Sequence, residues 1–366
     1  MPMVSDLEKT PRTNAEGDEA GIYASHVALS FTVLPILKAA IELNLLDIIA
    51  AEGPKFLSAA EVAAKLKSMN TEAGTIIDRM LRLLASHSLL QSFTRKGKDG
   101  DDQDVVERVY GIAPAGRFFV KSQDDGSLAT ILLLGCHPVT WEVWSGLKDV
   151  VLEGGDIYQR VHGMSLFQYM NKDPTFNKIF NVAMADYSVM TMKKILDTYK
   201  GFEGLTSLVD VGGGIGTSLS MIVAKYPSIK GVNYDLPHVV KHAPAYPGIE
   251  HIGGDMFVNV PKGETLMIKC ALHNWNDEQC LDILKNCYNA LPETGNLIVI
   301  DFVLPMEPDG SWADKHVTEL DTIMLVTLGG QERTMKEFES LCKKSGFSGF
   351  EFICYAHTTG VMEFHK

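Results

Sequence analysis

The sequence lacks the cysteine pattern of a disulfide-bonded or zinc-binding protein. Its six cysteines include no C-x-x-C pair and no spacing with histidines that would suggest a structural zinc site. Thiols of this kind fit a reducing compartment, so we expect a cytoplasmic protein. The amino terminus lacks the basic region and apolar run of a secretory signal. The uncharged stretch 21–37 contains a histidine, serines, a threonine and a proline and is predicted to be a poor membrane span.

The sequence also lacks an excess of positive charge. It has 33 Lys and Arg residues against 46 Asp and Glu residues, a formal net charge of -13. Such a surface repels nucleic acid phosphates and acidic membranes, so neither partner is expected. What the chain does have is length and apolar content, with 366 residues of which 46% are hydrophobic. This suffices for one large domain or two ordinary ones.

The pattern of apolar residues divides the chain into four segments. Residues 1–20 are polar and acid-rich and are predicted to form a flexible tail. Residues 21–125 are predicted to form a helical, winged-helix-like domain, and residues 126–200 a helical segment rich in aromatic residues and methionines. In residues 201–366 short apolar runs alternate with helical segments, which is typical of a parallel α/β sheet. We therefore expect the α/β class, with a Rossmann-like domain after an amino-terminal α-helical domain.

Local signals define the elements of the 21–125 domain. Pro35 predicts a break between two helical pieces, and an S-x-x-E capping box formed by Ser58 and Glu61 predicts a helix start. A charged, glycine-containing run is typical of a β-hairpin tip. The expected elements are helical pieces over Tyr23–Ala51, a helix from Ser58 through Leu66, a helix over Thr75–Leu89, and a hairpin with its tip at 95–104 and its return strand at 105–113.

Two helices and a wing resemble a winged-helix module, which leaves two interpretations. A DNA-binding module needs a basic recognition face, yet the basic residues of both helices are offset by nearby acids and by the acidic wing. The alternative is an interaction module whose apolar helices pack against a second copy of the chain. We favour this second interpretation and expect a homodimer.

The carboxyl-terminal segment contains five strand candidates for a parallel sheet and a final antiparallel pair. The final pair has no helix between its strands, and for that reason we expect it to be antiparallel. The parallel candidates are Ser207–Val211, Gly231–Tyr234, Glu250–Ile252, Thr265–Lys269 and Asn296–Phe302, and the final pair is Gly349–Tyr355 and Gly360–Phe364.

The first three strands of this series end in residues suited to a nucleoside. A glycine turn, Gly212 to Gly216, feeds a helix after the first strand, but Thr217 stands where a dinucleotide fingerprint needs its third glycine. Asp235 ends the second strand, where a carboxylate can accept hydrogen bonds from ribose hydroxyls. Asp255 ends the third, where it can hold an adenine amino group while Met256 packs against the ring. The alternatives are capped strand-end turns and a nicotinamide-dependent dehydrogenase, which the missing glycine disfavours.

These motifs resemble the plant O-methyltransferases typified by caffeic acid and isoflavone O-methyltransferases, which are metal-independent. The likeness runs from about Ile22 to Phe364 and is strongest in LVDVGGGIGTSLSMIVAKYPSIKGVNYDLPHV, GIEHIGGDMF and GGQERT. The resemblance implies that S-adenosylmethionine is the methyl donor. It also implies donor contacts from Ser188, Gly212, Asp235, Asp255, Met256, Lys269 and Trp275.

A histidine follows the fourth strand at the edge where open α/β sheets bind ligands. A phenol has a pKa of about 10, so its methylation at neutral pH needs a base, and His273 has suitable basicity. Asp301 is an acid within an apolar strand, a costly position unless it is paired, and Glu332 lies on a glycine-marked loop. The resemblance assigns both acids to orienting His273. Alternatively, the histidine is structural, and Glu332 pairs with Arg333 or caps the next helix.

The acceptor site rests mainly on the resemblance, because side chains at helical spacing, such as Phe176, Phe180, Met184 and Tyr187, more often form a core than a binding face. The resemblance places Leu166, Met170, Phe176, Phe180, Met184, Tyr187, Asn274, Ile323 and Met324 around an aromatic acceptor. Gly135 and Leu328 stand where enzymes acting on caffeic acid carry asparagines, which favours a different acceptor.

The expected reaction is transfer of a methyl group from S-adenosylmethionine to a hydroxyl of a small phenolic metabolite. The classes considered are phenylpropanoids, flavonoids, coumarins and alkaloid phenols. The alternative is methylation of an aromatic amine or alkaloid nitrogen, and retention of His273, Asp301 and Glu332 favours oxygen. No metal is expected, because the sequence shows no carboxylate cluster around the acceptor like that of metal-dependent catechol methyltransferases.

Overall fold

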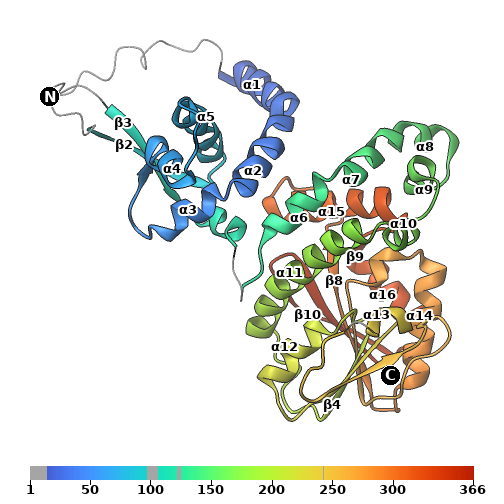
Figure 1. Ribbon diagram of the computed structural model, residues 1–366. Coiled ribbons are helices and arrows are strands. Elements are labelled where there is room, and N and C mark those ends of the chain that lie inside the picture. Colours follow the sequence, from blue (N-terminus) through green and yellow to red (C-terminus); the bar gives the residue numbers. More distant parts are fainter. Residues whose placement is uncertain (1–14, 97–105, 122–124, 242) are drawn as a thin grey trace. The chain divides into compact units, whose positions relative to one another are not determined.

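The computed structural model describes residues 15–96, 106–121, 125–241 and 243–366. The chain forms two compact units, Met1–Lys121 and Ser122–Lys366 (Figure 1). The first helix, α1 (Ala15–Leu29), begins within the stretch 1–20 that was expected to be a flexible tail. Acids such as Asp18 and Glu19 near a helix amino terminus interact favourably with the helix dipole, which explains the earlier start.

The first unit opens with helices that lie end to end. α1 is followed by a 3-10 turn, η1 (Ser30–Thr32), and then by α2 (Val33–Glu42) and α3 (Leu45–Ala51). The predicted break is present, but it precedes Pro35, which lies in the first turn of α2. Proline is tolerated there because the first backbone N–H groups of a helix have no partner within the helix.

A helix pair and a small sheet complete the first unit. Ser58 and Glu61 form the predicted capping box at the start of α4 (Ala59–Leu66). α5 (Ala73–Ser86) ends three residues before the predicted Leu89, because Ser88 adopts a left-handed φ of 58° and a strand begins at once. The antiparallel sheet has the order β1-β3-β2, and the predicted hairpin tip lies outside the described residues. Its strands are β1 (Leu57–Ser58), β2 (Leu90–Lys96) and β3 (Val106–Ile112).

The helical stretch Gly17–Glu42 is long and apolar enough to cross a membrane by length and composition. This finding differs from the sequence expectation of a poor span. Within the first unit, most of its apolar side chains lie on the surface rather than in the core. The large ones that are exposed are Ile22, Tyr23, Val27, Leu29, Phe31 and Leu34.

The second unit begins with a series of helices that ends in one long helix. Their apolar side chains form a shared core with the carboxyl-terminal part of α15 (Trp312–Leu328), through Val326 and Leu328. Two short 3-10 turns, η2 (Ala115–Phe119) in the first unit and η3 (Trp144–Gly146) here, complete this part of the chain. The helices are α6 (Leu128–Gly135), α7 (Pro138–Val143), α8 (Leu147–Glu153), α9 (Ile157–His162), α10 (Leu166–Lys172) and α11 (Pro174–Thr198).

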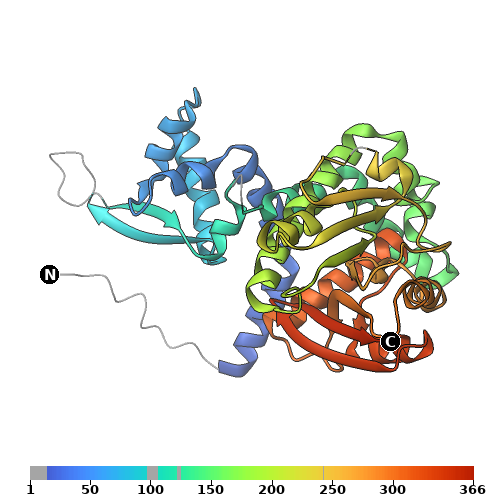
Figure 2. The same ribbon diagram turned by 90° about the horizontal axis from the view of Figure 1, so that it is seen from below.

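The sheet of the second unit has the order β10-β11-β8-β7-β4-β5-β6, with β9 paired to β8. The predicted strands are all present to within one or two residues at each end, and the last pair is antiparallel as expected. Figure 2 shows these strands side by side as one twisted sheet. They are β4 (Ser207–Val211), β5 (Lys230–Asp235), β6 (Ile249–Gly253), β7 (Thr265–Lys269), β8 (Asn296–Leu304), β9 (Arg333–Thr334), β10 (Gly349–Ala356) and β11 (Thr359–His365).

Alternating side chains of the strands form a core on each face of this sheet. In β7, Leu266 and Ile268 belong to one core and Met267 to the other, as the two-residue period of a strand requires. Helices α14 (Asp277–Ala290) and α16 (Met335–Lys344) cover the first face, and α11 and α12 (Thr217–Lys225) cover the second. A short helix, α13 (Pro237–Val240), follows β5.

The central strands β6, β5, β4, β7 and β8 are parallel. Their carboxyl ends therefore lie along one edge of the sheet, where ligands bind in open α/β folds. This edge receives the glycine turn, Asp235, the segment after β6 and the 3-10 turn η4 (Leu272–Asn274), which carries His273.

Candidate active site

The glycine turn after β4 is fixed to the neighbouring strand by its backbone. The N–H groups of Gly212 and Gly213 donate to the carbonyl oxygen of Tyr234 at 2.8 and 3.3 Å. Gly212, Gly214 and Gly216 have φ values of 72°, 60° and 86°, a region that favours glycine. A Cβ atom on Gly213 would lie 2.2 Å from Oδ1 of Asn233. The shape of this loop therefore requires glycine at these positions.

Asp235 and Asp255 lie at the ends of adjacent strands beside this loop. Asp235 accepts hydrogen bonds from the Gly214 N–H at 2.8 Å and the Leu236 N–H at 2.7 Å. Asp255 accepts one from the Phe257 N–H at 2.9 Å. The Met256 sulfur lies 3.8 Å from the position that a Cβ of Gly212 would take. The structure thus brings together the glycine loop, both acids and Met256.

The three remaining residues predicted to contact the donor are Trp275, Lys269 and Ser188. The Trp275 ring meets Phe257 edge-on with 4.9 Å between ring centroids. Its indole Nε1 is buried and finds no hydrogen-bond partner among the described residues. The Lys269 amino group donates to the Ser188 hydroxyl at 3.4 Å, which joins the end of β7 to α11.

Sequence reasoning missed a polar layer beneath the glycine loop. Asp210 is buried within β4, and burial raises its pKa to about 7. Asn233 is also fully buried, and its amide group donates to the Gly214 carbonyl at 2.8 Å and faces the Nδ1 atom of His251 at 3.2 Å. The signal available in the sequence was an acid inside the apolar strand LVDV, the same signal that pointed to Asp301.

His273, Asp301 and Glu332 come from three separate parts of the chain and meet at one point. The Nδ1 atom of His273 lies 2.8 Å from Oε1 of Glu332 and 3.4 Å from Oδ1 of Asp301. The Asp301 and Glu332 side chains are 1% and 0% exposed and that of His273 is 11% exposed. Because both acids face Nδ1, Nε2 is the nitrogen that is left to accept a proton from a ligand.

Burial and mutual charge act against each other in this cluster. Burial opposes the charged imidazolium, but the charges of Asp301 and Glu332 outweigh it and raise the pKa of His273 above its usual range. Burial raises the pKa of Glu332 to about 7, against the opposing hydrogen bond from His273. Burial likewise raises the pKa of Asp301. The cluster therefore has a strong affinity for one proton.

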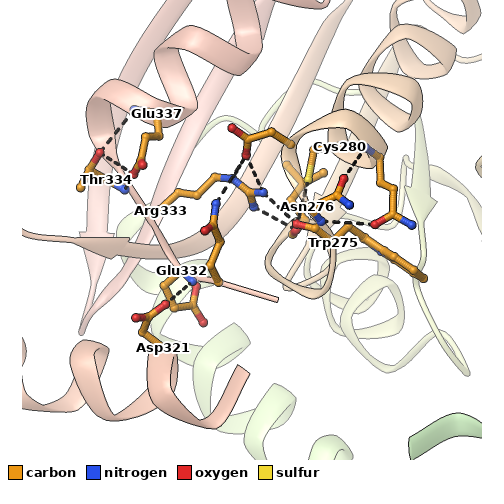
Figure 3. Close-up of polar contacts among 12 residues, drawn as sticks. Trp275, Asn276, Cys280, Asp321, Glu332, Arg333, Thr334 and Glu337 are labelled. Atoms are coloured by element: carbon orange, nitrogen blue, oxygen red, sulfur yellow. Dashed lines mark hydrogen bonds and ion pairs between the residues drawn. The ribbon is translucent and has the colours of Figure 1, made fainter. Parts of the chain in front are cut away.

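Both sequence alternatives for Glu332 are wrong. The ion pair of Arg333 is with Asp277, at 2.9 Å, and the following helix is capped by Thr334 and Glu337 (Figure 3). The backbone N–H of Glu332 donates to Asp321 of α15 at 2.8 Å, a contact that sequence reasoning did not find. Asp321 thus holds the backbone of Glu332 while the Glu332 side chain binds His273.

Aromatic rings connect the histidine to α11. The His273 ring stacks on Phe302 with 6.4 Å between centroids and 19° between planes. Phe302 in turn contacts Tyr187 of α11 and His316 of α15, with centroid distances of 6.3 and 6.0 Å. The Tyr187 hydroxyl lies 3.4 Å from Nε2 of His316, a residue that sequence reasoning missed. Tyr187 is therefore close to the candidate base.

The remaining predicted acceptor residues lie on four elements of the second unit. Leu166 and Met170 of α10 and Phe176 of α11 are buried in one core cluster, with Phe180 packed against it. Met184 of α11 and Ile323 of α15 are 38% and 39% exposed, and Met324 is the next residue on α15. Three of these side chains are thus core residues, as the helical pattern alone indicated. Asn274 follows His273 in η4.

The sequence expectation that no carboxylate cluster is present needs correction. His273, Asp301 and Glu332 each offer a ligand atom, and these atoms lie within 4.8 Å of one another. The cluster arises because β8 and the loop before β9 are adjacent in the sheet but separated in the sequence. The resemblance to the O-methyltransferases implied this proximity, which the residue pattern by itself does not reveal.

Comparisons with known proteins agree with this geometry. Residues 144–348 match the model of the O-methyltransferase domain, and residues 25–122 match that of the O-methyltransferase dimerisation domain. A caffeic acid 3-O-methyltransferase of Eucalyptus gunnii is 53% identical over 99% of this chain and 98% of its own length. Caffeic acid 3-O-methyltransferase 1 of Populus tremuloides is 51% identical over the whole of both chains.

A solved structure shows the same fold at lower identity. Human N-acetylserotonin methyltransferase, in complex with S-adenosylmethionine, has a TM-score of 0.79 and 24% identity over 96% of this chain and 99% of its own. The sequence-based expectations of a Rossmann-like methyltransferase domain and a helical dimerisation domain are confirmed, and the dimerisation domain supports a homodimer. The chain belongs to the O-methyltransferase family, and it is an S-adenosylmethionine-dependent O-methyltransferase.

Proposed function

We propose that this enzyme methylates a phenolic hydroxyl of a small plant-type metabolite, with His273 as the general base. The observation that carries the proposal is the position of the His273 imidazole. Its Nδ1 faces two buried carboxylates at 2.8 and 3.4 Å, at the edge of the sheet that also holds the glycine loop. Names of the relatives, caffeic acid 3-O-methyltransferases, support a phenolic acceptor.

The residues present fit the methyl donor. The unpartnered Nε1 of Trp275 and the carboxylates of Asp235 and Asp255 offer one donor and two acceptor groups around the glycine loop, as a nucleoside requires. We assign donor binding to these residues with Gly212, Met256, Lys269 and Ser188. S-adenosylmethionine supplies a positively charged sulfonium whose methyl group is open to attack by a nucleophile.

The base is set up by its two acids. A hydrogen bond from the Nδ1–H group to Glu332 fixes the tautomer and leaves Nε2 free to take the phenolic proton. The buried charges of Asp301 and Glu332 stabilise the imidazolium that results, which is why the pKa of His273 is raised. As the phenolic oxygen gains negative charge, its attack on the methyl carbon becomes easier.

The acceptor is assigned to the side of the edge formed by α10, α11 and α15. The residues proposed to line it are Leu166, Met170, Phe176, Phe180, Met184, Tyr187, Asn274, Ile323 and Met324, whose apolar and aromatic side chains suit a flat ring. Among the described residues, no atom lies within 4 Å of the position that a Cβ of Gly135 would take. Together with Leu328, this position supports an acceptor that differs from caffeic acid at its ring substituents.

We further propose that no metal takes part. The nitrogen that a metal would bind, Nδ1 of His273, already has a hydrogen-bond partner in Glu332 at 2.8 Å, and a metal there would compete with the orientation of the base. Full activity after treatment with EDTA is expected, and a loss that added Mg²⁺ or Zn²⁺ restores would refute this point.

The remaining parts of the proposal concern location and partners. The exposed apolar side chains of Gly17–Glu42 are proposed to pack against the second copy rather than a lipid bilayer, since they adjoin the dimerisation domain. The net charge of -13 supports the absence of a nucleic acid partner. The free thiols support a cytoplasmic location.

A methyl-transfer assay tests the proposal directly. Purified enzyme is incubated with labelled S-adenosylmethionine and a panel of phenols and aromatic amines, alongside His273→Ala and the control His365→Ala, at the end of β11 where it pairs with Asn296 of β8. We expect transfer to phenols that falls about 10²- to 10⁴-fold in His273→Ala and is unchanged in the control. Transfer to amines alone, or full activity of His273→Ala, would refute the proposal.

A further inference from the structure

Arg333 is a fully buried cation next to the candidate base. Its residue exposure is 1%, and burial of a guanidinium is costly unless its N–H groups are hydrogen-bonded. Nη1 donates to the Leu272 carbonyl at 3.1 Å, and Nη2 donates to the Trp275 carbonyl at 2.8 Å. Nε and Nη2 donate to Oδ1 of Asp277 at 3.0 and 2.9 Å. Figure 3 shows the side chain pointing from β9 toward Trp275.

The carbonyl groups that Arg333 holds lie on either side of His273. One belongs to Leu272, the residue before the histidine, and the other to Trp275, two residues after it. The segment 272–275 consists of the 3-10 turn η4 and the residue that follows it. Its internal hydrogen bonds join residues that are close in the sequence. Its position relative to Glu332 therefore depends on contacts from outside the turn, and a planar guanidinium can bridge two carbonyl groups at a fixed spacing.

The residues before Arg333 contact the same turn. The Gln331 N–H donates to the His273 carbonyl at 2.9 Å. A Cβ atom on Gly330 would lie 2.0 Å from that same carbonyl oxygen, so the close approach of the two segments requires glycine. Glu332, between Gln331 and Arg333, binds the imidazole itself. Three consecutive residues thus hold the backbone and the side chain of His273.

The two kinds of contact that Arg333 makes differ in their exposure to water. The Asp277 side chain is 58% exposed, so water screens its attraction to the guanidinium. The two carbonyl contacts are formed by a guanidinium whose side chain is 1% exposed, and water does not replace them easily. The main task of the cation is therefore to hold the turn rather than to complete an ion pair.

We propose that Arg333 is a positioning residue that sets the base His273 and the donor-site residue Trp275 with one side chain. By holding carbonyl groups on both sides of the histidine, it keeps the imidazole in reach of Glu332 and keeps the indole beside Phe257. Loss of the guanidinium fork should thus weaken donor binding and catalysis together. This inference rests on the proposed role of His273, but its donor-binding and titration readouts do not require the acceptor to be known.

The test compares Arg333→Lys and Arg333→Met with Asp277→Asn in the full-length enzyme. Lysine keeps the charge but has no planar fork, and methionine keeps volume without donors. We expect kcat to fall about 10²-fold in both Arg333 variants, the loss typical of a misplaced catalytic group. We also expect weaker donor binding by calorimetry, at roughly tenfold higher Kd. Asp277→Asn should change either quantity less than about threefold, because the pair is exposed.

A spectroscopic readout separates positioning from general destabilisation. The imidazole of His273 can be titrated by NMR with ¹³C-labelled histidine and assigned with His273→Ala. Displacement from the two acids should lower its pKa in Arg333→Lys, while the melting temperature tells whether the protein is folded. An unchanged titration together with unchanged donor Kd in Arg333→Lys would overturn the proposal. If Arg333→Met fails to fold, Arg333→Lys and Gly330→Ala still decide the question. Absence of phenol methylation in wild-type enzyme would refute the acceptor assignment instead, and leave this titration informative.

Discussion

The donor side and the acceptor side of the sheet edge are built in different ways. The donor side is fixed by backbone groups: the Gly212 N–H binds the Tyr234 carbonyl, and the Gly214 N–H binds Asp235. The acceptor side consists of side chains on α10, α11 and α15 that pack against one another. A backbone-defined site tolerates few sequences, whereas a packed surface accepts many combinations of similar volume. One fold can therefore keep its methyl donor while its acceptors differ.

The base stands between these two sides and shares features of both. The turn that carries His273 is held by the backbone N–H of Gln331 and the side chain of Arg333. The His273 ring stacks on Phe302, which also meets Tyr187 of the acceptor side. Changes to the base should therefore affect catalysis without changing the affinity for either ligand. Substitutions at the base should therefore separate catalysis from ligand binding most clearly.

The largest expected effect is on Glu332. In Glu332→Ala the imidazole loses its 2.8 Å hydrogen bond and the charge that supports the imidazolium. We expect kcat to fall about 10²- to 10⁴-fold while the donor Kd, measured by calorimetry, changes less than threefold. A matched Glu339→Ala on the exposed side of α16 should leave both unchanged. Equal losses in kcat and donor affinity would contradict the separation of base and donor site.

The pH dependence of kcat gives a second test of the role of Glu332. The base must be unprotonated, and both acids raise the pKa of His273, so the acidic limb of kcat should lie above the usual histidine value of about 6.5. Removal of the Glu332 charge should shift that limb to lower pH. A limb that does not move in Glu332→Ala would show that another group titrates.

A smaller loss is expected on the donor side. Asp235→Ala removes a carboxylate assigned to the ribose hydroxyls and breaks the bond to the Gly214 N–H. Hydrogen bonds to a charged group contribute about 1.5–3 kcal/mol, so the donor Kd should rise about 10- to 10²-fold. The ratio of rates for two acceptors should not change. A change in acceptor preference in this variant would show that the two sides are not independent.

Sequence alone predicted the strands and the glycine loop at this edge well because their signals are local. The strand boundaries, the glycine loop and the strand-end acids Asp235 and Asp255 follow from short patterns, since backbone conformation restricts residue type there. His273 was found from its place after the fourth strand, at the edge where ligands bind, and Asp301 as an acid within an apolar strand. The α4 capping box is a further local signal that the structure contains.

Apart from Asp210, the features that sequence reasoning missed are contacts between distant segments. Arg333 looked like a partner for its neighbour Glu332, but it reaches Asp277 and the carbonyl groups beside His273. His316 joins Tyr187 across more than a hundred residues. Such contacts depend on how helices pack on the sheet, and one sequence without relatives does not fix that packing.

A further, smaller effect is expected on the acceptor side. Met184 and Ile323 are the most exposed of the large side chains assigned there, at 38% and 39%. Met184→Ala and Ile323→Ala should alter the ratio of kcat/KM for two phenols of different size by about tenfold, as a changed apolar contact does. Donor Kd should stay the same, and the exposed Val151→Ala on α8 serves as control. An unchanged ratio for every acceptor pair would remove these residues from the acceptor site.

The smallest effect concerns stability and comes from Asp210 beneath the glycine loop. Its pKa is raised from an ordinary 3.8 to about 7 in the folded protein, so the folded state holds this proton more tightly than the unfolded chain. Between those two pH values the unfolded chain loses the proton first, and stability falls as pH rises. Asp210→Asn removes this cost and should flatten the fall of the melting temperature between about pH 4 and pH 8. The free-energy cost of this buried carboxylate is a few kcal/mol at most, which corresponds to a difference of several degrees in melting temperature.

The measurement is a series of thermal melts across that pH range, with Asp282→Asn as a control at an exposed acid of α14. Glu332 titrates in the same direction because burial raises its pKa to about 7, so the slope should be reduced rather than abolished in Asp210→Asn. The combined variant Asp210→Asn with Glu332→Gln should be flatter still. If Asp210→Asn melts with the pH dependence of the wild type, Asp210 is already ionised at low pH. The polar layer beneath the donor loop would then be charged rather than neutral, and the donor side would bind its cationic ligand partly through that charge.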